Sequence, residues 1–311
     1  MSLKHTAKEI KRWLIYVNVY ALVRMLRLLP RRAAIAIMRG LALAVFFLLK
    51  SKRNRTVKHL ATAFGHKKSS EEINRIARQV FLNIGTFAAD AIRIPQIFRN
   101  GNGTGHMITI KGREHLDQAL KNGRGAILLT AHFGNWELLG AWLARKGYKL
   151  KVVSAPNRDL RLDKIIVEAR NRAGYTNITR ASNTREIIRG LRDGYSIGIL
   201  IDQDTKVEGV FVKFFNQWAH TAVGPVVLAK KYDLKIIPVF IRLNGNFTYH
   251  IEVQEPLPLE FTGDKGHDLI VNTQKCSDAY EQIISQYPEQ WVWMHRRWKK
   301  QPDAEKAMSL N

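Results

Sequence analysis

The 311-residue sequence lacks several features by which enzymes are commonly recognised. Its single cysteine, Cys276, excludes an intrachain disulfide and a cysteine metal cluster, and fits a reducing compartment. The G-x-S-x-G string of serine hydrolases and the H-E-x-x-H string of zinc peptidases are both absent. The ten histidines are scattered along the chain, so no metal site is predicted.

Acidic residues are scarce. The 26 Asp and Glu are outnumbered by 50 Lys and Arg, for a net charge of +24. A surface this basic attracts nucleic acid, anionic lipid headgroups or acidic proteins. Nucleic-acid binding would show helix-turn-helix spacing or aromatic-basic RNP strings, and neither is found, so no nucleic-acid partner is expected. The charge by itself is also compatible with a basic protein that binds membranes without being an enzyme.

Residues 1–50 contain two apolar runs, 13–29 and 33–49, each shorter than the about 20 apolar residues of a spanning helix. Arg24, Arg27 and Arg39 interrupt these runs, and basic clusters flank them. An arginine at the bilayer centre costs roughly 2.5–3.5 kcal/mol, whereas an arginine on an interfacial helix reaches the headgroups. We therefore expect a membrane-anchoring helical segment at 1–50. A helical hairpin buried in a soluble core is the alternative.

Apolar strands alternate with helices beyond residue 105, which predicts an α/β fold with a largely parallel or mixed central sheet flanked by helices. Residues 51–100 are predicted to be helical, with a capping pattern at 69–72. Strands are predicted at 108–110, 125–130, 150–154, 196–201, 235–241 and 248–253, and helices at 113–121, 135–146, 159–173, 183–192, 221–231 and 268–286. The strand at 248–253 alternates polar and apolar residues, so we expect it to be an antiparallel addition at the sheet edge.

The richest chemistry lies in residues 126–137, AILLTAHFGNWE. A buried strand ends at His132, and Asn135 is the predicted N-cap of the next helix. His132 therefore lies at the carboxyl end of a strand, where open α/β sheets bind ligands. Glu137, in the first helical turn, is expected to reach the imidazole and fix its tautomer, so that His132 can act as a general base. A histidine with a purely structural role is the alternative.

Several strings, taken together, resemble the late acyltransferases of lipid A biosynthesis, within the broader glycerolipid acyltransferase superfamily. His132 and Glu137 match the histidine–four residues–acid motif of that family. Further matches, in the family's order, are APNR at 155–158, EARNRAG at 168–174, IDQD at 201–204, GVFVKFF at 209–215 and PEQWVWMHRRW at 288–298. The resemblance covers nearly the whole chain, although His59 stands where an asparagine is expected.

The resemblance implies an O-acyltransferase whose α/β domain spans 51–311. It would move an acyl chain from acyl carrier protein to a hydroxyl of an anionic glycolipid, a lipid A precursor, at the cytoplasmic face of the bacterial inner membrane. The carrier is acidic, which agrees with the +24 charge. No cofactor is implied. The alternatives are another membrane lipid as acceptor, or acyl-CoA as donor.

Substrate-binding roles are implied for five polar residues. Arg180 matches an arginine near the reacting acyl group or phosphate, where a guanidinium can bind phosphate or stabilise an oxyanion. Asp202 and Gln203 close the strand 196–201, where they can orient arginines or accept hydrogen bonds from sugar hydroxyls. Asn157 and Arg170 are further candidates for the same reasons.

The carboxyl-terminal string 288–298 mixes aromatic and cationic side chains. Arg296 and Arg297 lie among Trp291, Trp293 and Trp298. This mixture suits a membrane interface or a lipid phosphate. Packing of the carboxyl terminus against the fold is the alternative.

Overall fold

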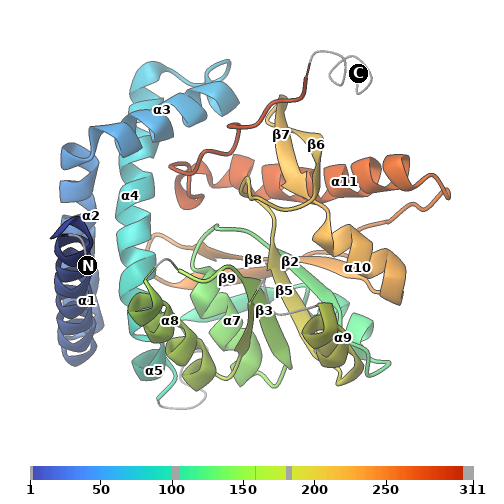
Figure 1. Ribbon diagram of the computed structural model, residues 1–311, viewed down its shortest axis with the longest axis horizontal. Coiled ribbons are helices and arrows are strands. Elements are labelled where there is room, and N and C mark those ends of the chain that lie inside the picture. Colours follow the sequence, from blue (N-terminus) through green and yellow to red (C-terminus); the bar gives the residue numbers. More distant parts are fainter. Residues whose placement is uncertain (1–2, 100–105, 158, 180–183, 304–311) are drawn as a thin grey trace.

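A seven-stranded sheet forms the centre of the computed structural model, which describes residues 3–99, 106–157, 159–179 and 184–303 (Figure 1). The strand order is β1-β9-β8-β2-β5-β3-β4, and β6 and β7 form a separate two-stranded hairpin. The strands are β1 (Ile108–Lys111), β2 (Ile127–Thr130), β3 (Leu150–Ser154), β4 (Thr176–Thr179), β5 (Ser196–Leu200), β6 (Gly209–Phe214), β7 (Gln217–Ala222), β8 (Ile236–Leu243) and β9 (Tyr249–Val253).

Helices flank this sheet, as the α/β pattern predicts. They are α1 (Leu3–Leu28), α2 (Arg31–Leu48), α3 (Lys50–Phe64), α4 (Ser70–Ile92), α5 (Ile94–Ile97), α6 (Arg113–Leu120), α7 (Trp136–Arg145), α8 (Leu160–Ala173), α9 (Thr184–Arg192), α10 (Gly224–Tyr232) and α11 (Lys265–Gln286). The predicted start of α4 is confirmed, because Ser69 and Glu72 form a capping box.

The two faces of the sheet belong to two hydrophobic cores. In β2, Ile127 and Leu129 pack with residues of α3, α4, α10 and α11. Leu128, between them, points to the other core, which α6 and α7 cover. A strand buried on both faces must be apolar throughout, which explains why β2 shows no alternation in the sequence.

The sheet is mixed. β2 pairs in parallel with β5 and β8, whereas β8 and β9 are antiparallel. The antiparallel direction of β9 is therefore confirmed, but its predicted place at the edge is wrong. β1 pairs in parallel with the outer side of β9 and takes that edge.

The hairpin of β6 and β7 corrects the prediction of a helix at 221–231. Residues 217–222 pair antiparallel with 209–214, so the helix α10 begins only at Gly224. Phe215 and Asn216, at the tip, both have positive φ, as the tight two-residue turns of hairpins require. The short strand β4 was also not predicted.

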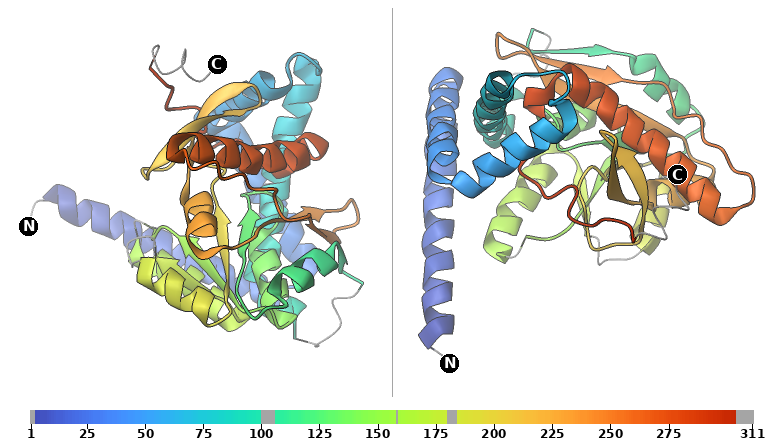
Figure 2. Two further views of the ribbon diagram at one scale, coloured as in Figure 1. Left: turned by 90° about the vertical axis from the view of Figure 1, so that its right-hand side faces the viewer. Right: turned by 90° about the horizontal axis from the view of Figure 1, so that it is seen from above.

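The amino-terminal helices join the body unequally. α2 packs along α4, where Arg31 donates two hydrogen bonds of 2.7 Å to the buried carboxylate of Asp90. The start of α1 instead reaches beyond the rest of the molecule (Figure 2). In the described ranges no single helix is long and apolar enough to cross a bilayer. α2 and α3, bent by 89° at their junction, meet that criterion only as a pair.

Candidate active site

His132 lies in the loop that joins β2 to α7. Gly134 in this loop has a φ of 56°, and a Cβ there would lie 1.7 Å from the carbonyl oxygen of Ile241. Asn135 then caps α7, as predicted, because its side chain accepts a hydrogen bond from the backbone N–H of Leu138. The turn therefore fixes His132 at the carboxyl end of β2.

The imidazole of His132 is held by Asp202, from the end of the neighbouring strand β5. Nδ1 lies 3.0 Å from Asp202 Oδ1, and the backbone N–H of His132 donates to Oδ2 at 2.9 Å. Burial alone would raise the pKa of Asp202, but the charge and hydrogen bonds of His132 outweigh burial, so this pKa is lowered. An ionised Asp202 accepts the proton of Nδ1–H and leaves the lone pair on Nε2, as a general base needs.

The carboxyl-terminal segment completes the surroundings of Asp202. Trp291 Nε1 donates to Asp202 Oδ2 at 2.8 Å, and the N–H of Val292 donates to the carbonyl of His132 at 3.2 Å. Tyr280, on α11, donates to the carbonyl of Thr130 at 2.9 Å. Asp202 is fully buried and its oxygens contact His132 and Trp291, so its predicted role in substrate binding stays a prediction. Its acceptors are used to hold the histidine.

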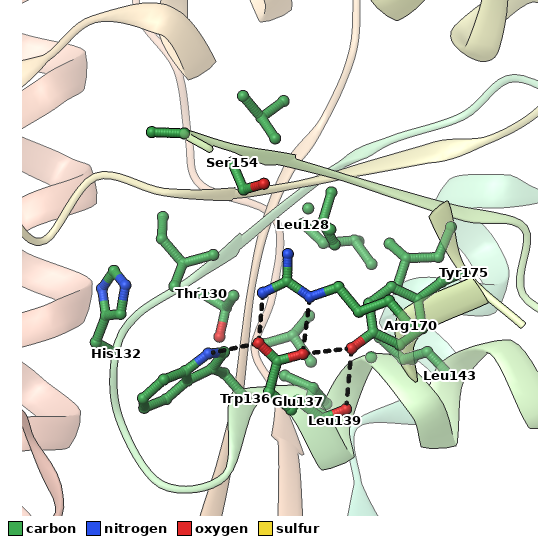
Figure 3. Close-up of a pocket in the computed structure, with 18 of the residues that line it drawn as sticks. Leu128, Thr130, His132, Trp136, Glu137, Leu139, Leu143, Ser154, Arg170 and Tyr175 are labelled. Carbon is green, nitrogen blue, oxygen red and sulfur yellow. Dashed lines mark hydrogen bonds and ion pairs between the residues drawn. The ribbon is translucent and has the colours of Figure 1, made fainter. Parts of the chain in front are cut away.

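Glu137 does not reach His132, which corrects the predicted partnership (Figure 3). Its carboxylate accepts two hydrogen bonds from Arg170, at 2.9 Å from Nε for the longer one, and one of 2.7 Å from the hydroxyl of Tyr175. Trp136 Nε1 donates at 3.2 Å. Burial raises the pKa of Glu137, but these donors, Arg170 foremost, lower it further than burial raises it. Glu137 is thus an ionised partner of α8.

Three of the other predicted binding residues, Arg170, Asn157 and Gln203, line the cavity beside His132, but their polar partners differ. Arg170 is occupied by Glu137 and by Asn177, whose Oδ1 lies 2.8 Å from Nη1. Asn157 is exposed and hydrogen-bonds Asp163. Gln203 lines the same cavity as His132 and is half-buried. Arg180 lies outside the described residues.

A cavity of about 450 Å³ opens beside His132, with α7 on one side and β2, β3 and β5 on the other (Figure 3). Its walls are mainly apolar and include Leu128, Leu139, Leu143, Leu150, Val152 and Val239. Gly140 and Gly198 also line it, so no side chain projects into the space at these two positions. The polar lining includes Thr130, Ser154 and the Glu137–Arg170 pair. A mainly apolar cavity with a histidine beside it suits a hydrocarbon chain with one reactive end.

Arg297 belongs to the core beneath this site. It is fully buried and donates to the carbonyl of His220 and to the hydroxyl of Thr221, each at 2.6 Å. Burial lowers its pKa to about 10. Packing, rather than contact with a lipid phosphate, is therefore the role of Arg297, whereas Arg296 is exposed. Within the described ranges no three His, Cys, Asp or Glu residues gather as around a metal ion.

Comparison with known proteins identifies the family of the chain. A family profile described as bacterial lipid A biosynthesis acyltransferase matches residues 2–300. The chain is 25% identical to a phosphatidylinositol mannoside acyltransferase of Mycobacterium tuberculosis, over 61% of this chain and 59% of that protein. It is 23% identical to a lipid A biosynthesis acyltransferase of Haemophilus influenzae, over 94% and 90%. A lipid A biosynthesis lauroyltransferase of Escherichia coli is 25% identical over 62% of each chain. The match spans less than two thirds of the first and third relatives.

Proposed function

Because the chain belongs to the bacterial lipid A biosynthesis acyltransferase family and is an O-acyltransferase, we propose that it acylates a hydroxyl of an anionic glycolipid, most specifically a lipid A precursor. The observation that carries this proposal is the His132–Asp202 pair beside an apolar cavity. His132 is the proposed general base, and Asp202 orients it. Glu137, the acid of the sequence motif, is proposed to support the cavity wall through Arg170.

The proposed reaction is direct transfer from a thioester. Nε2 of His132 takes the proton of the acceptor hydroxyl while the hydroxyl oxygen attacks the thioester carbonyl carbon. The tetrahedral intermediate then collapses, the carbon–sulfur bond breaks, and the imidazolium returns the proton to the departing thiolate. The acyl chain lies in the apolar cavity, so its carbonyl end meets His132. Arg180, Gln203 and Asn157 stay candidates for contacts with the polar parts of the substrates.

The proposed donor is an acyl chain on acyl carrier protein, an acidic partner for a protein of net charge +24. Acyl-CoA is the alternative donor. The names of the relatives point to two acceptors, phosphatidylinositol mannosides and lipid A, which are both glycolipids. The acceptor class, a sugar hydroxyl of a membrane glycolipid, is therefore supported more firmly than the particular lipid.

We place the protein at the cytoplasmic face of the bacterial inner membrane, with residues 1–50 in contact with lipid. Large apolar side chains on α1 are exposed, among them Ile10, Trp13, Leu14 and Tyr20. Arginine-bearing helices with such a face lie in the headgroup region of a bilayer. Because α2 packs on α4, the second half of the segment 1–50 is also part of the folded α/β domain. The proposed anchor is therefore not a separate unit.

Replacement of His132 by alanine tests the proposal. We expect turnover with carrier-bound acyl donor and glycolipid acceptor to fall about 10²–10⁴-fold, because the base is lost while the fold is kept. Lipid mass spectrometry of cells with and without the gene identifies the product as a gain of one acyl chain. A His132→Ala protein that turns over at the unchanged rate would refute the mechanism. A glycolipid profile without any change would refute the acceptor.

A further inference from the structure

A groove of about 840 Å³ lies at the corner where α2 turns into α3, with α4 as its other wall. Phe46 and Phe47 contribute its apolar part. Arg53 and Lys58 of α3 line it together with Arg75 and Arg78 of α4, and no carboxylate is among its lining residues. The guanidinium of Arg53 lies over the ring of Phe46, at 5.7 Å from its centroid. The groove is therefore a cationic site with an aromatic floor.

The positive charge of this region is not balanced by acids. α3 carries Lys50, Lys52, Arg53, Arg55 and Lys58 in 15 residues, without an Asp or Glu. Of the four cations that line the groove, only Arg75 has an ion pair in the described part of the chain, with Glu72 at 4.0 Å. The hollow that shares Lys58 with the groove extends the charge, because it adds Arg55, Arg296 and Lys299. The hollow that shares Arg75 adds one cation and one anion, Arg39 and Glu289.

Apolar side chains project beside these cations. Phe47 is 55% exposed and Leu48 is 78% exposed, and Leu49 follows at 49%. An acidic protein would match the charges but has no need of projecting apolar side chains. A bilayer with anionic lipids takes both, since the cations meet phosphates at the depth where apolar side chains enter the acyl boundary.

We propose that the groove binds the phosphate headgroup of an anionic phospholipid of the bilayer, with Phe47 and Leu48 inserted beside it. The guanidinium groups of Arg53, Arg75 and Arg78 offer the donors that a phosphate accepts. This lipid is neither donor nor acceptor in the acyl transfer. The inference rests on the membrane location of the proposed function and adds a defined docking site to it.

The position of α3 links this docking site to the catalytic loop. His59 Nδ1 lies 2.8 Å from the carbonyl of Trp293, and Arg55 donates to the carbonyl of Met294 at 3.2 Å. The same segment bonds the loop of His132 through Val292. A bilayer bound at the corner therefore holds the catalytic loop at a fixed place relative to the lipid surface.

The first experiment removes two of the groove's charges. We expect Arg53→Gln/Arg78→Gln to weaken binding to vesicles of phosphatidylcholine with phosphatidylglycerol about 25-fold, since each basic residue near such a surface contributes roughly 5-fold. Arg189→Gln/Arg192→Gln is the matched control. It removes the same charge from exposed positions on α9, which lies across the molecule from α3 (Figure 1). The control should bind these vesicles nearly as well as the unchanged protein. Sedimentation with vesicles measures both.

The second experiment places a fluorescent reporter at the corner. Leu48→Cys can be labelled selectively with an environment-sensitive dye, because the native Cys276 is buried and burial raises its pKa to about 12. We expect the dye to brighten and shift to the blue with anionic vesicles, and much less with phosphatidylcholine alone. Val227→Cys, exposed on α10, is the control and should not respond.

Three results would overturn the inference. The first is equal weakening of vesicle binding in the two double variants. The second is a dye at position 48 whose fluorescence does not change with anionic vesicles. The third is a groove variant that keeps vesicle binding but loses binding to acyl carrier protein. All of these measurements are made without acyl donor. Selective vesicle binding by a protein that transfers no acyl chain would therefore refute only the proposed function. An active enzyme whose dye at position 48 does not respond to anionic vesicles would refute only this inference.

Discussion

Two carboxylates flank the loop of His132, and they differ in almost every physical respect. Asp202 comes from the neighbouring strand, is fully buried, and accepts from the imidazole itself. Glu137 comes from the helix that follows the histidine, and its side chain is 21% exposed. Its carboxylate accepts hydrogen bonds from Arg170 and Tyr175. One carboxylate is bound to the imidazole of His132, and the other joins α7 to α8 and Tyr175 in the cavity wall.

Closeness in sequence therefore does not select the partner of a histidine. A carboxylate in the first turn of a helix points away from the strand end when a cation on another helix attracts it. A carboxylate that follows the adjacent parallel strand, as Asp202 follows β5, lies beside the histidine that follows β2. The comparison predicts that Asp202 controls the rate of transfer and that Glu137 contributes mainly to stability.

The largest effect is expected for Asp202→Asn. Oδ2 accepts two N–H groups, from His132 and Trp291, so the amide oxygen of asparagine must take its place. The NH₂ group then faces Nδ1 and donates to it, which leaves the proton on Nε2 and removes the base. We expect turnover to fall about 10²–10⁴-fold with little change in KM.

Asp204→Asn is the matched control for this variant. Asp204 lies two residues along the chain, and its carboxylate contacts His220 at 3.2 Å rather than His132. Turnover of the Asp204→Asn variant should fall far less than turnover of Asp202→Asn. Steady-state kinetics of the two variants checks the assignment, and similar losses in both would mean that general disturbance of this segment, not the tautomer, limits transfer.

A smaller effect on rate and a larger effect on stability are expected for Glu137→Gln. The change leaves the guanidinium of Arg170, only 14% exposed, without its anionic partner. We expect the free energy of unfolding to fall by roughly 2–3 kcal/mol, and turnover to fall much less than in Asp202→Asn. Denaturant unfolding and kinetics on the same samples test this. A rate loss equal to that of Asp202→Asn would return Glu137 to the role of orienting the base.

The stability effect of Glu137 has a defined pH dependence. Its pKa is lowered in the folded protein from the ordinary value of 4.5. The contribution to stability is therefore complete above pH 4.5 and is lost as the pH falls below it, toward the folded pKa. The difference in stability between the unchanged protein and Glu137→Gln should be constant at neutral pH and should shrink below pH 4.5. A difference that grows on acidification would contradict the ion pair.

The place of His132 could be predicted from the sequence because its signals are local. An apolar strand, a glycine turn and an N-cap asparagine follow each other within ten residues, and the structure has all three. The partner of His132 could not be predicted in this way. Asp202 is 70 residues away, and its contact depends on β5 lying next to β2, which is a property of strand order.

The misassigned elements have similar causes. The predicted helix at 221–231 began too early because Thr221 and Ala222 are equally compatible with the end of a hairpin strand. The turn at Phe215 and Asn216 contains no glycine to mark the hairpin. Arg297 suggested a surface role because arginines are rarely buried. Its burial follows from two oxygen acceptors supplied by β7, which no nearby string reveals.

The smallest effect is expected for Tyr175→Phe, which removes one donor from Glu137 and leaves Arg170 in place. The hydroxyl of Tyr175 donates to Glu137 Oε2 at 2.7 Å, and its pKa is raised well above the ordinary value by burial, so it keeps its proton. Phenylalanine preserves the ring, and thus the packing on Gly140. We expect a loss of roughly 1–2 kcal/mol in the free energy of unfolding and turnover close to that of the unchanged protein. The pKa of Glu137 should rise, so acid should weaken this variant at a higher pH. Tyr148→Phe is the control and should cost less, because it removes only exposed hydrogen bonds, one donated to Asp117 and one accepted from Arg113. Unfolding curves at several pH values measure these differences. A strong loss of turnover in Tyr175→Phe, with stability intact, would place Glu137 and its donors in the chemical step and end the distinction between the two carboxylates.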